Sequence, residues 1–295
     1  MMVVANVSAE LMRWIFGLIF TPSQLADMHH MVNQIVSFAA FGIGFSVALA
    51  VMKHWIKIPS RVAFPRKKGH FSVTFPAIFI CLGVSILGSI LYVFLSMMME
   101  AGFGISTSSP DFTPPRGALP IAVFLISLTV LPSILEELLF RGVIMQSLRR
   151  FGDGFALIVS SILFGIIHLN LAQAIPAFLS GLLIGYFVLR TGSIWTGIII
   201  HFVNNSIAAA QLLITHDAGD EMLIATNMFI ITFYLLSGSV AFMYLFFRER
   251  GTLFRLAPSA VPVREGKKYL YFFTATMAIV FCMIAVIITS LVWMS

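Results

Sequence analysis

Long stretches without a charged residue constrain the fold of this chain more than any other feature of the sequence. Uncharged runs occupy residues 31–52, 71–99, 117–135, 154–189, 191–215, 222–247 and 269–295. About 20 apolar residues cross the hydrocarbon core of a bilayer as one helix. Charged residues make up only 10% of the chain and mean hydropathy is +1.00, whereas soluble domains average about 25% charged residues. The sequence therefore predicts an all-α, polytopic membrane protein.

The fourth run is too long for a single helix. Its 36 residues would form a helix of about 54 Å, and the polar, proline-containing segment Asn170–Pro176 interrupts it. Two short helices are expected there, which gives eight transmembrane helices in total. The segment Ser8–Phe20 is too short to span and lacks the basic region of a signal peptide, so an N-terminal interfacial helix is predicted. We expect an interfacial segment at 1–30 and one transmembrane domain at 31–295.

The distribution of basic residues predicts the orientation, because lysine and arginine favour cytoplasmic loops. Placing the N-terminus outside puts 15 of the 18 basic residues in cytoplasmic loops, namely Lys53, Lys57, Arg61, Arg66, Lys67, Lys68, Arg149, Arg150, Arg190, Arg248, Arg250, Arg255, Arg264, Lys267 and Lys268. Both termini are then non-cytoplasmic. The net charge of +6 is thus explained by topology and by contact with anionic lipid head groups, and it does not imply nucleic acid.

Polar side chains inside the apolar runs are the candidates for function, because they are costly in lipid. They lie on three predicted helices: Glu136, Glu137 and Arg141, then His168, then His201, Asn204 and Asn205. Counted from the cytoplasmic helix ends at about 1.5 Å per residue, Glu136, His168 and Asn205 lie roughly 20, 18 and 19 Å deep. Three helices thus bring polar groups to one level, which predicts a shared site.

Helical spacing suggests different tasks for these residues. Glu137 and Arg141 are four apart and can pair, whereas Glu136 points about 100° away from them. A carboxylate without an ionic partner in a low-dielectric site is suited to act as a general base. His201 and Asn205 are also four apart, and together they can donate two hydrogen bonds to a developing oxyanion.

At these residues the chain resembles a known family. The motifs E-E-x-x-x-R (Glu136, Glu137, Arg141), F-x-x-x-H (Phe164, His168) and H-x-x-x-N (His201, Asn205) are similar to those of the CPBP family. These are the CAAX proteases and bacteriocin-processing proteins, also called ABI, which include Rce1-like prenyl-protein proteases.

The resemblance implies an intramembrane glutamate protease with its catalytic core at about 117–215. It implies that Glu136 and His168 activate a water molecule, that His201 and Asn205 stabilise the oxyanion, and that Glu137 and Arg141 brace the site. Asn204 offers a second amide beside Asn205, so either asparagine is a candidate for the site. No cofactor is expected. The partners are a peptide or protein substrate and the lipid bilayer.

Several alternatives stay open at this stage. Glu136, His168 and His201 are possible zinc ligands, since histidine and carboxylate bind that metal. Intramembrane acids and histidines also occur in ion-coupled transporters, and a catalytically silent scaffold or immunity protein would keep the same fold. The substrate is a prenylated CAAX-type peptide, a leader or bacteriocin-like peptide, or a membrane anchor. The expected location is the cell membrane of a prokaryote or the endoplasmic reticulum membrane of a eukaryote.

Overall fold

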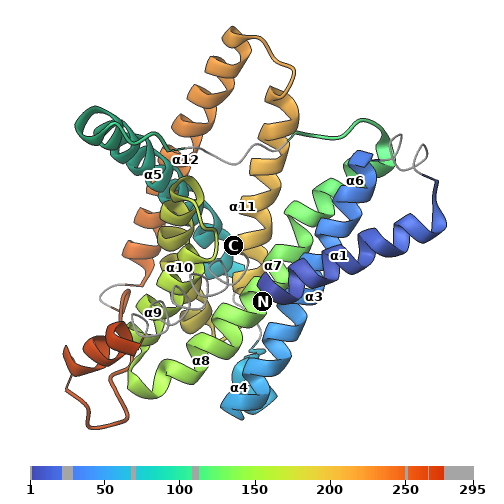
Figure 1. Ribbon diagram of the computed structural model, residues 1–295. Helices are drawn as coiled ribbons and strands as arrows, with labels where there is room; N and C mark the ends of the chain where they lie inside the picture. Colours follow the sequence, from blue (N-terminus) through green and yellow to red (C-terminus); the bar gives the residue numbers. More distant parts are fainter. Residues whose placement is uncertain are drawn as a thin grey trace.

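Helices account for every regular element that the computed structural model describes, which covers residues 2–21, 29–67, 71–107, 113–249, 252–264 and 266–275 (Figure 1). They are α1 (Met2–Ile19), α3 (His29–Ile56), α4 (Ser60–Ala63), α5 (Phe71–Phe103), α6 (Ala118–Leu128), α7 (Val130–Glu137), the π-helical η1 (Leu138–Ile144), α8 (Met145–Leu148), the short 3-10 helix η2 (Arg149–Phe151), α9 (Asp153–Ile166), α10 (Leu171–Thr191), α11 (Ile194–Thr215), α12 (Asp220–Arg248) and an unlabelled helical stretch at 266–275. The predicted all-α class is confirmed for the described part of the chain.

Six described segments are long and apolar enough to cross a membrane, so the protein is a multi-pass integral membrane protein. They are Ile35–Ile56, Phe71–Phe103, Ala118–Phe151, Leu171–Thr191, Ile194–Thr215 and Asp220–Arg248. The predicted division of run 154–189 is present as α9 and α10, although α9 has only 14 residues. Most of the last predicted span, 269–295, lies outside the described residues. The total of eight spans therefore stays a prediction.

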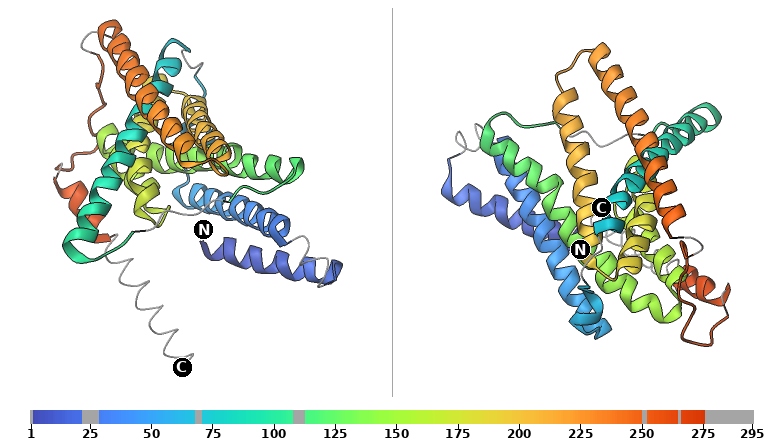
Figure 2. Two further views of the ribbon diagram at one scale, coloured as in Figure 1. Left: turned by 90° about the horizontal axis from the view of Figure 1, so that it is seen from above. Right: turned by 180° about the vertical axis from the view of Figure 1, so that it is seen from behind.

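The N-terminal helix is longer than the segment predicted for it. It covers Met2–Ile19 rather than 8–20, and it packs along α3 (Figure 2). Its placement at the membrane surface and the non-cytoplasmic location of both termini remain predictions.

The centre of the bundle is built around α5, which packs against both α10 and α12. Glycines allow these helices to approach closely, as in other membrane proteins. A Cβ atom on Gly88 of α5 would lie 2.7 Å from the Cα of Pro176 in α10. A Cβ on Gly238 of α12 would lie 2.9 Å from the carbonyl oxygen of Phe79. Helices far apart in sequence are thereby held in contact through their backbones.

The basic loops join one another at a single end of the bundle, which we call the basic face. Lys67 N donates to Gly192 O at 3.1 Å and Ile194 N to Pro65 O at 2.9 Å. On the same face Arg190 pairs with Glu249. The C-terminal part of the described chain joins the loop after α8, where Lys268 Nζ donates to Phe151 O at 2.8 Å. The described parts of these basic loops thus form one connected layer.

The segment Ala118–Phe151 crosses the bundle obliquely and is irregular in two places (Figure 1). At Thr129, α6 ends and α7 begins. Directly after Glu137 the helix widens into the π-helical turn Leu138–Ile144. Such turns are rare and occur frequently at functional sites. This one lies next to the two adjacent glutamates.

Candidate active site

Glu137 and Arg141 form an ion pair in the interior of the protein. Arg141 Nη1 donates to Glu137 Oε1 at 2.9 Å, and both side chains are fully buried. The guanidinium carbon also lies 4.2 Å from the ring centroid of Phe164, a cation–π contact that is stronger away from water. Because Gly181 and Gly197 carry no side chain, neighbouring helices leave room for the pair. A Cβ on Gly197 would lie 2.8 Å from Glu137 Oε2.

His201 on α11 contacts both glutamates. Its Nδ1 lies 3.0 Å from Glu137 Oε1, and its Nε2 lies 3.8 Å from Glu136 Oε2. A carboxylate oxygen only accepts hydrogen bonds, so Nδ1 carries the proton in this contact. The Nε2 atom is thereby turned toward Glu136. Glu137 consequently does more than pair with Arg141, because it also fixes the orientation of the imidazole.

The turn between α9 and α10 holds His168 next to these residues. His168 Nδ1 lies 3.0 Å from the carbonyl oxygen of Phe164, and since a carbonyl only accepts, Nδ1 is the donor. Asn170 secures the turn, because its side chain donates to His168 O at 2.7 Å and accepts from Gln173 N at 2.9 Å. Asn170 thus caps α10. The turn also forces Leu169 to a φ of 56°, which is unusual outside glycine.

Asn205 is held by a carbonyl group that a proline has freed. Its Nδ2 donates to Leu128 O at 3.1 Å across 77 residues. Residue 132, four positions after Leu128, is proline, which has no N–H to complete the normal helical bond to that oxygen. The side chain of Asn205 takes the place of that donor. One amide hydrogen of Asn205 is used in this way and the other is free for a ligand.

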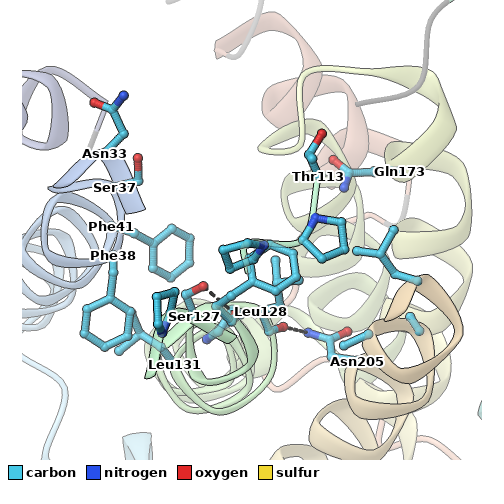
Figure 3. A pocket seen from close by; sticks show the side chains of 18 of the residues that line it. Asn33, Ser37, Phe38, Phe41, Thr113, Ser127, Leu128, Leu131, Gln173 and Asn205 are labelled. Carbon is cyan, nitrogen blue, oxygen red and sulfur yellow. Dashed lines mark hydrogen bonds between the residues drawn. The ribbon is translucent and has the colours of Figure 1, made fainter. Parts of the chain in front are cut away.

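A large cavity reaches these residues. It has a volume of about 1330 Å³, and its lining includes Glu136, His168, His201 and Asn205. Side chains of α3 form one wall, α6 and α7 form the floor, and Gln173 and Asn205 lie opposite α3 (Figure 3). Glu136 is only 6% exposed and His201 only 5%. Glu136 and His201 are therefore shielded from the surroundings, whereas His168 and Asn205 are half-buried.

The zinc alternative requires three ligand side chains that converge on one point. Among the described residues, no group of three histidine, cysteine, aspartate or glutamate side chains is placed to hold a metal ion. The Nδ1 atoms of His168 and His201 are engaged with Phe164 O and Glu137 Oε1, which leaves each Nε2 atom available, as is usual for a histidine that binds a metal. Both the metal-free expectation and the zinc alternative formed by Glu136, His168 and His201 therefore stay predictions.

The structure brings together the residues that the sequence singled out. Glu136, His168, His201 and Asn205 line one cavity, and Asn204 does not line it. Their catalytic roles stay predictions. Sequence reasoning missed the walls that α3 and residues 113–116 contribute, and it missed the link between Asn205 and Leu128. Pro132 was the available signal for that link, because a proline inside a helix always leaves a carbonyl without its usual partner.

Comparisons with known proteins converge on this part of the chain. Residues 118–207 match the family described as type II CAAX prenyl endopeptidase Rce1-like. Over 142 residues the chain is 28% identical to a Bacillus subtilis (strain 168) protein named "Putative membrane peptidase YdiL", which covers 45% of this chain. The match spans 58% of that relative's length. No solved structure matches the chain. The matched family segment contains all three motifs.

Proposed function

We propose that the protein is an intramembrane endopeptidase in which Glu136 is the general base, because residues 118–207 match the Rce1-like family. The observation that carries this proposal is the difference between two adjacent glutamates. Glu137 is bound to Arg141 and His201, whereas Glu136 lines the cavity beside His168, His201 and Asn205. One carboxylate is thus committed to structure, and the other faces the space where a substrate would bind.

The proposed reaction is hydrolysis of a peptide bond by a water molecule. Glu136 removes a proton from the water, whose oxygen forms a bond to the peptide carbonyl carbon while the carbonyl electrons move to oxygen. His201 and Asn205 stabilise the resulting oxyanion. When the tetrahedral intermediate collapses, the C–N bond breaks and Glu136 delivers its proton to the leaving nitrogen. Peptide and water are thereby converted to a carboxylic acid and an amine.

The hydrogen bonds of the two histidines support distinct roles. Since His168 donates from Nδ1 to Phe164 O, its Nε2 is an acceptor in the neutral ring and can hold a hydrogen of the attacking water. His201 donates from Nδ1 to Glu137, so its Nε2 donates to an oxyanion only when both ring nitrogens are protonated.

Glu137 and Arg141 are proposed to position these groups without touching substrate. Neither lines the cavity, and Glu137 Oε1 joins Arg141 to His201. Their contribution would therefore act through the orientation of His201 and through the stability of the helix crossing.

Replacing Glu136 tests the proposal directly. We expect Glu136→Gln to lower the turnover number by about 10²–10⁴-fold, the usual contribution of a general base, with an unchanged melting temperature. The assay uses purified protein in proteoliposomes and quenched fluorescent peptides, both prenylated and unmodified. Glu100→Gln is the matched control, because Glu100 is exposed and does not line the cavity. If Glu136→Gln cleaves as fast as Glu100→Gln, Glu136 is not the base.

Chelators separate the metal-free mechanism from a zinc-dependent one. We expect full activity in EDTA or phenanthroline, because no three histidine, cysteine, aspartate or glutamate side chains of the described residues converge on a metal position. Loss of activity that Zn²⁺ restores would contradict the metal-free mechanism.

A further inference from the structure

The walls of the cavity come from the helix ends that lie farthest from the basic face. They include the first turns of α3 (Asn33 to Phe41), residues 113–116 before α6, and the last turns of α11 (Ala208 to Leu212). The opposite end of α3 carries Lys53, and Arg149 directly follows α8. Both residues lie at the basic face. The cavity is therefore asymmetric across the bundle.

The position of Glu136 within the segment Ala118–Phe151 shows how deep the cavity is. From Ala118 to Glu136 is 18 residues, or about 27 Å along a helix at 1.5 Å per residue. Cavity-lining residues follow this path from Pro120 through Phe124, Leu128 and Pro132 to Glu136. The lining thus continues from residues 113–116, where we place the mouth of the cavity, along α6 and α7 to the proposed base.

The path from the basic face to Glu136 is closed by packed side chains. Between Glu136 and Arg149 the chain contains the continuous segment Leu139–Gln146, in which every residue is buried. Phe140 of this segment packs against Phe164, and Met145 belongs to the main hydrophobic core. None of these residues lines the cavity. A substrate on the basic face is therefore about 20 Å of packed helix away from Glu136.

The positive-inside rule converts this asymmetry into a direction of entry. Loops rich in lysine and arginine remain in the cytoplasm, and here those loops form the face opposite the cavity mouth. We propose that substrate reaches Glu136 from the non-cytoplasmic side of the membrane. The substrate class is then an exported peptide, or the outer flank of a membrane anchor, rather than a peptide tethered to the cytoplasmic surface. This inference rests on the proposed function for its chemistry but not for its geometry.

The wall of the cavity suits an apolar, extended peptide segment. Phe38, Phe41, Phe124 and Leu131 line its middle, whereas polar residues such as Asn33 and Thr113 lie nearer the mouth. An extended chain advances about 3.3–3.6 Å per residue, so a path of about 27 Å takes up roughly eight residues. The expected substrate places a short apolar stretch next to the cleaved bond and polar residues beyond it, toward the aqueous non-cytoplasmic surface.

Cysteine accessibility tests the direction of entry without any measurement of activity. In a chain whose two cysteines are replaced by alanine, we introduce Ser127→Cys in the cavity wall or Ser60→Cys at the exposed start of α4, next to Arg61 on the basic face. A membrane-impermeant maleimide should label Ser127→Cys in intact cells and Ser60→Cys only in inside-out vesicles. Labelling of Ser127→Cys only from the cytoplasmic side, or from neither side, would overturn the proposal.

Two reporter proteins then separate this inference from the proposed function. Each is a single-span protein with the same apolar target segment, placed on the non-cytoplasmic flank in one reporter and on the cytoplasmic flank in the other. We expect cleavage of the outer reporter alone, with loss of cleavage in Glu136→Gln. Glu136-dependent cleavage of the inner reporter would support the protease and refute the direction of entry. If neither reporter is cut while Ser127→Cys is labelled from outside, the geometric inference stands and the proteolytic function is contradicted.

Discussion

The buried pair of Glu137 and Arg141 permits a prediction that separates stability from catalysis. Replacing Arg141 by methionine keeps the approximate length of the side chain and removes its charge. Glu137 then keeps His201 as a partner at 3.0 Å but loses the donor at 2.9 Å. Because both members of the pair are fully buried, the remaining carboxylate has no access to water.

The size of the effect follows from that burial. Removing one partner of a buried ion pair costs about 3–5 kcal/mol, and the lost cation–π contact to Phe164 at 4.2 Å adds to it. We expect a loss near 3 kcal/mol, because His201 still contacts Glu137. At about 2–4 °C per kcal/mol for chains of this size class, the melting temperature should fall by roughly 6–12 °C.

The pair of Arg149 and Asp153 provides a control with the same spacing. Its N–O distance is 2.7 Å, but the Arg149 side chain is 42% exposed, so Arg149→Met should cost about 1 kcal/mol or less. The melting temperatures of both variants are measured in one detergent at one heating rate. If Arg141→Met and Arg149→Met lower the melting temperature equally, burial does not govern the strength of these pairs.

The double variant Glu137→Met with Arg141→Met tests the second half of the argument. Replacing both partners of a buried pair by apolar residues is often neutral or stabilising, so stability should return to near that of the parent protein. Activity should stay low, because His201 loses the acceptor that orients its ring. A double variant as unstable as Arg141→Met contradicts the desolvation argument. A stable, fully active one contradicts the positioning role of Glu137.

Two further predictions concern neighbouring residues. Asn205→Ala should reduce the turnover number by about 10²–10³-fold, the usual loss for one oxyanion donor, with little change in KM. Asn227→Ala is the control, because Asn227 accepts a hydrogen bond from Gln211 and neither residue lines the cavity. An equal loss in both variants would contradict the oxyanion role. Gly197→Ala should destabilise the protein by about 1–3 kcal/mol, because the new Cβ would meet Glu137 Oε2 at 2.8 Å and Val188 Cγ2 at 2.7 Å. Gly17→Ala, where no atom lies within 4 Å, should leave the melting temperature unchanged, and similar curves for both would refute the close-packing argument.

Much of the fold and the candidate site was accessible from sequence because it depends on local patterns. Long uncharged runs predicted the membrane helices. The predicted break between α9 and α10 is present, but it lies at 167–170, and residues 171–176 of the segment Asn170–Pro176 are already part of α10. The four-residue spacing between Glu137 and Arg141 predicted an ion pair, and the structure contains it. Each of these follows from helical periodicity or from the cost of charge in lipid, both of which act over a few residues.

The sequence by itself determined that the chain enters a membrane and which polar residues it must place there. Only the tertiary structure decided that His201 bonds to Glu137 across 64 residues, that Asn205 replaces the donor lost at Pro132, and that the cavity opens away from the basic face. The physical reason is that one helix fixes which side chains share a face, whereas the approach of different helices depends on packing along their whole lengths. Spacing therefore identified the residues, and packing set the direction from which a substrate can reach them.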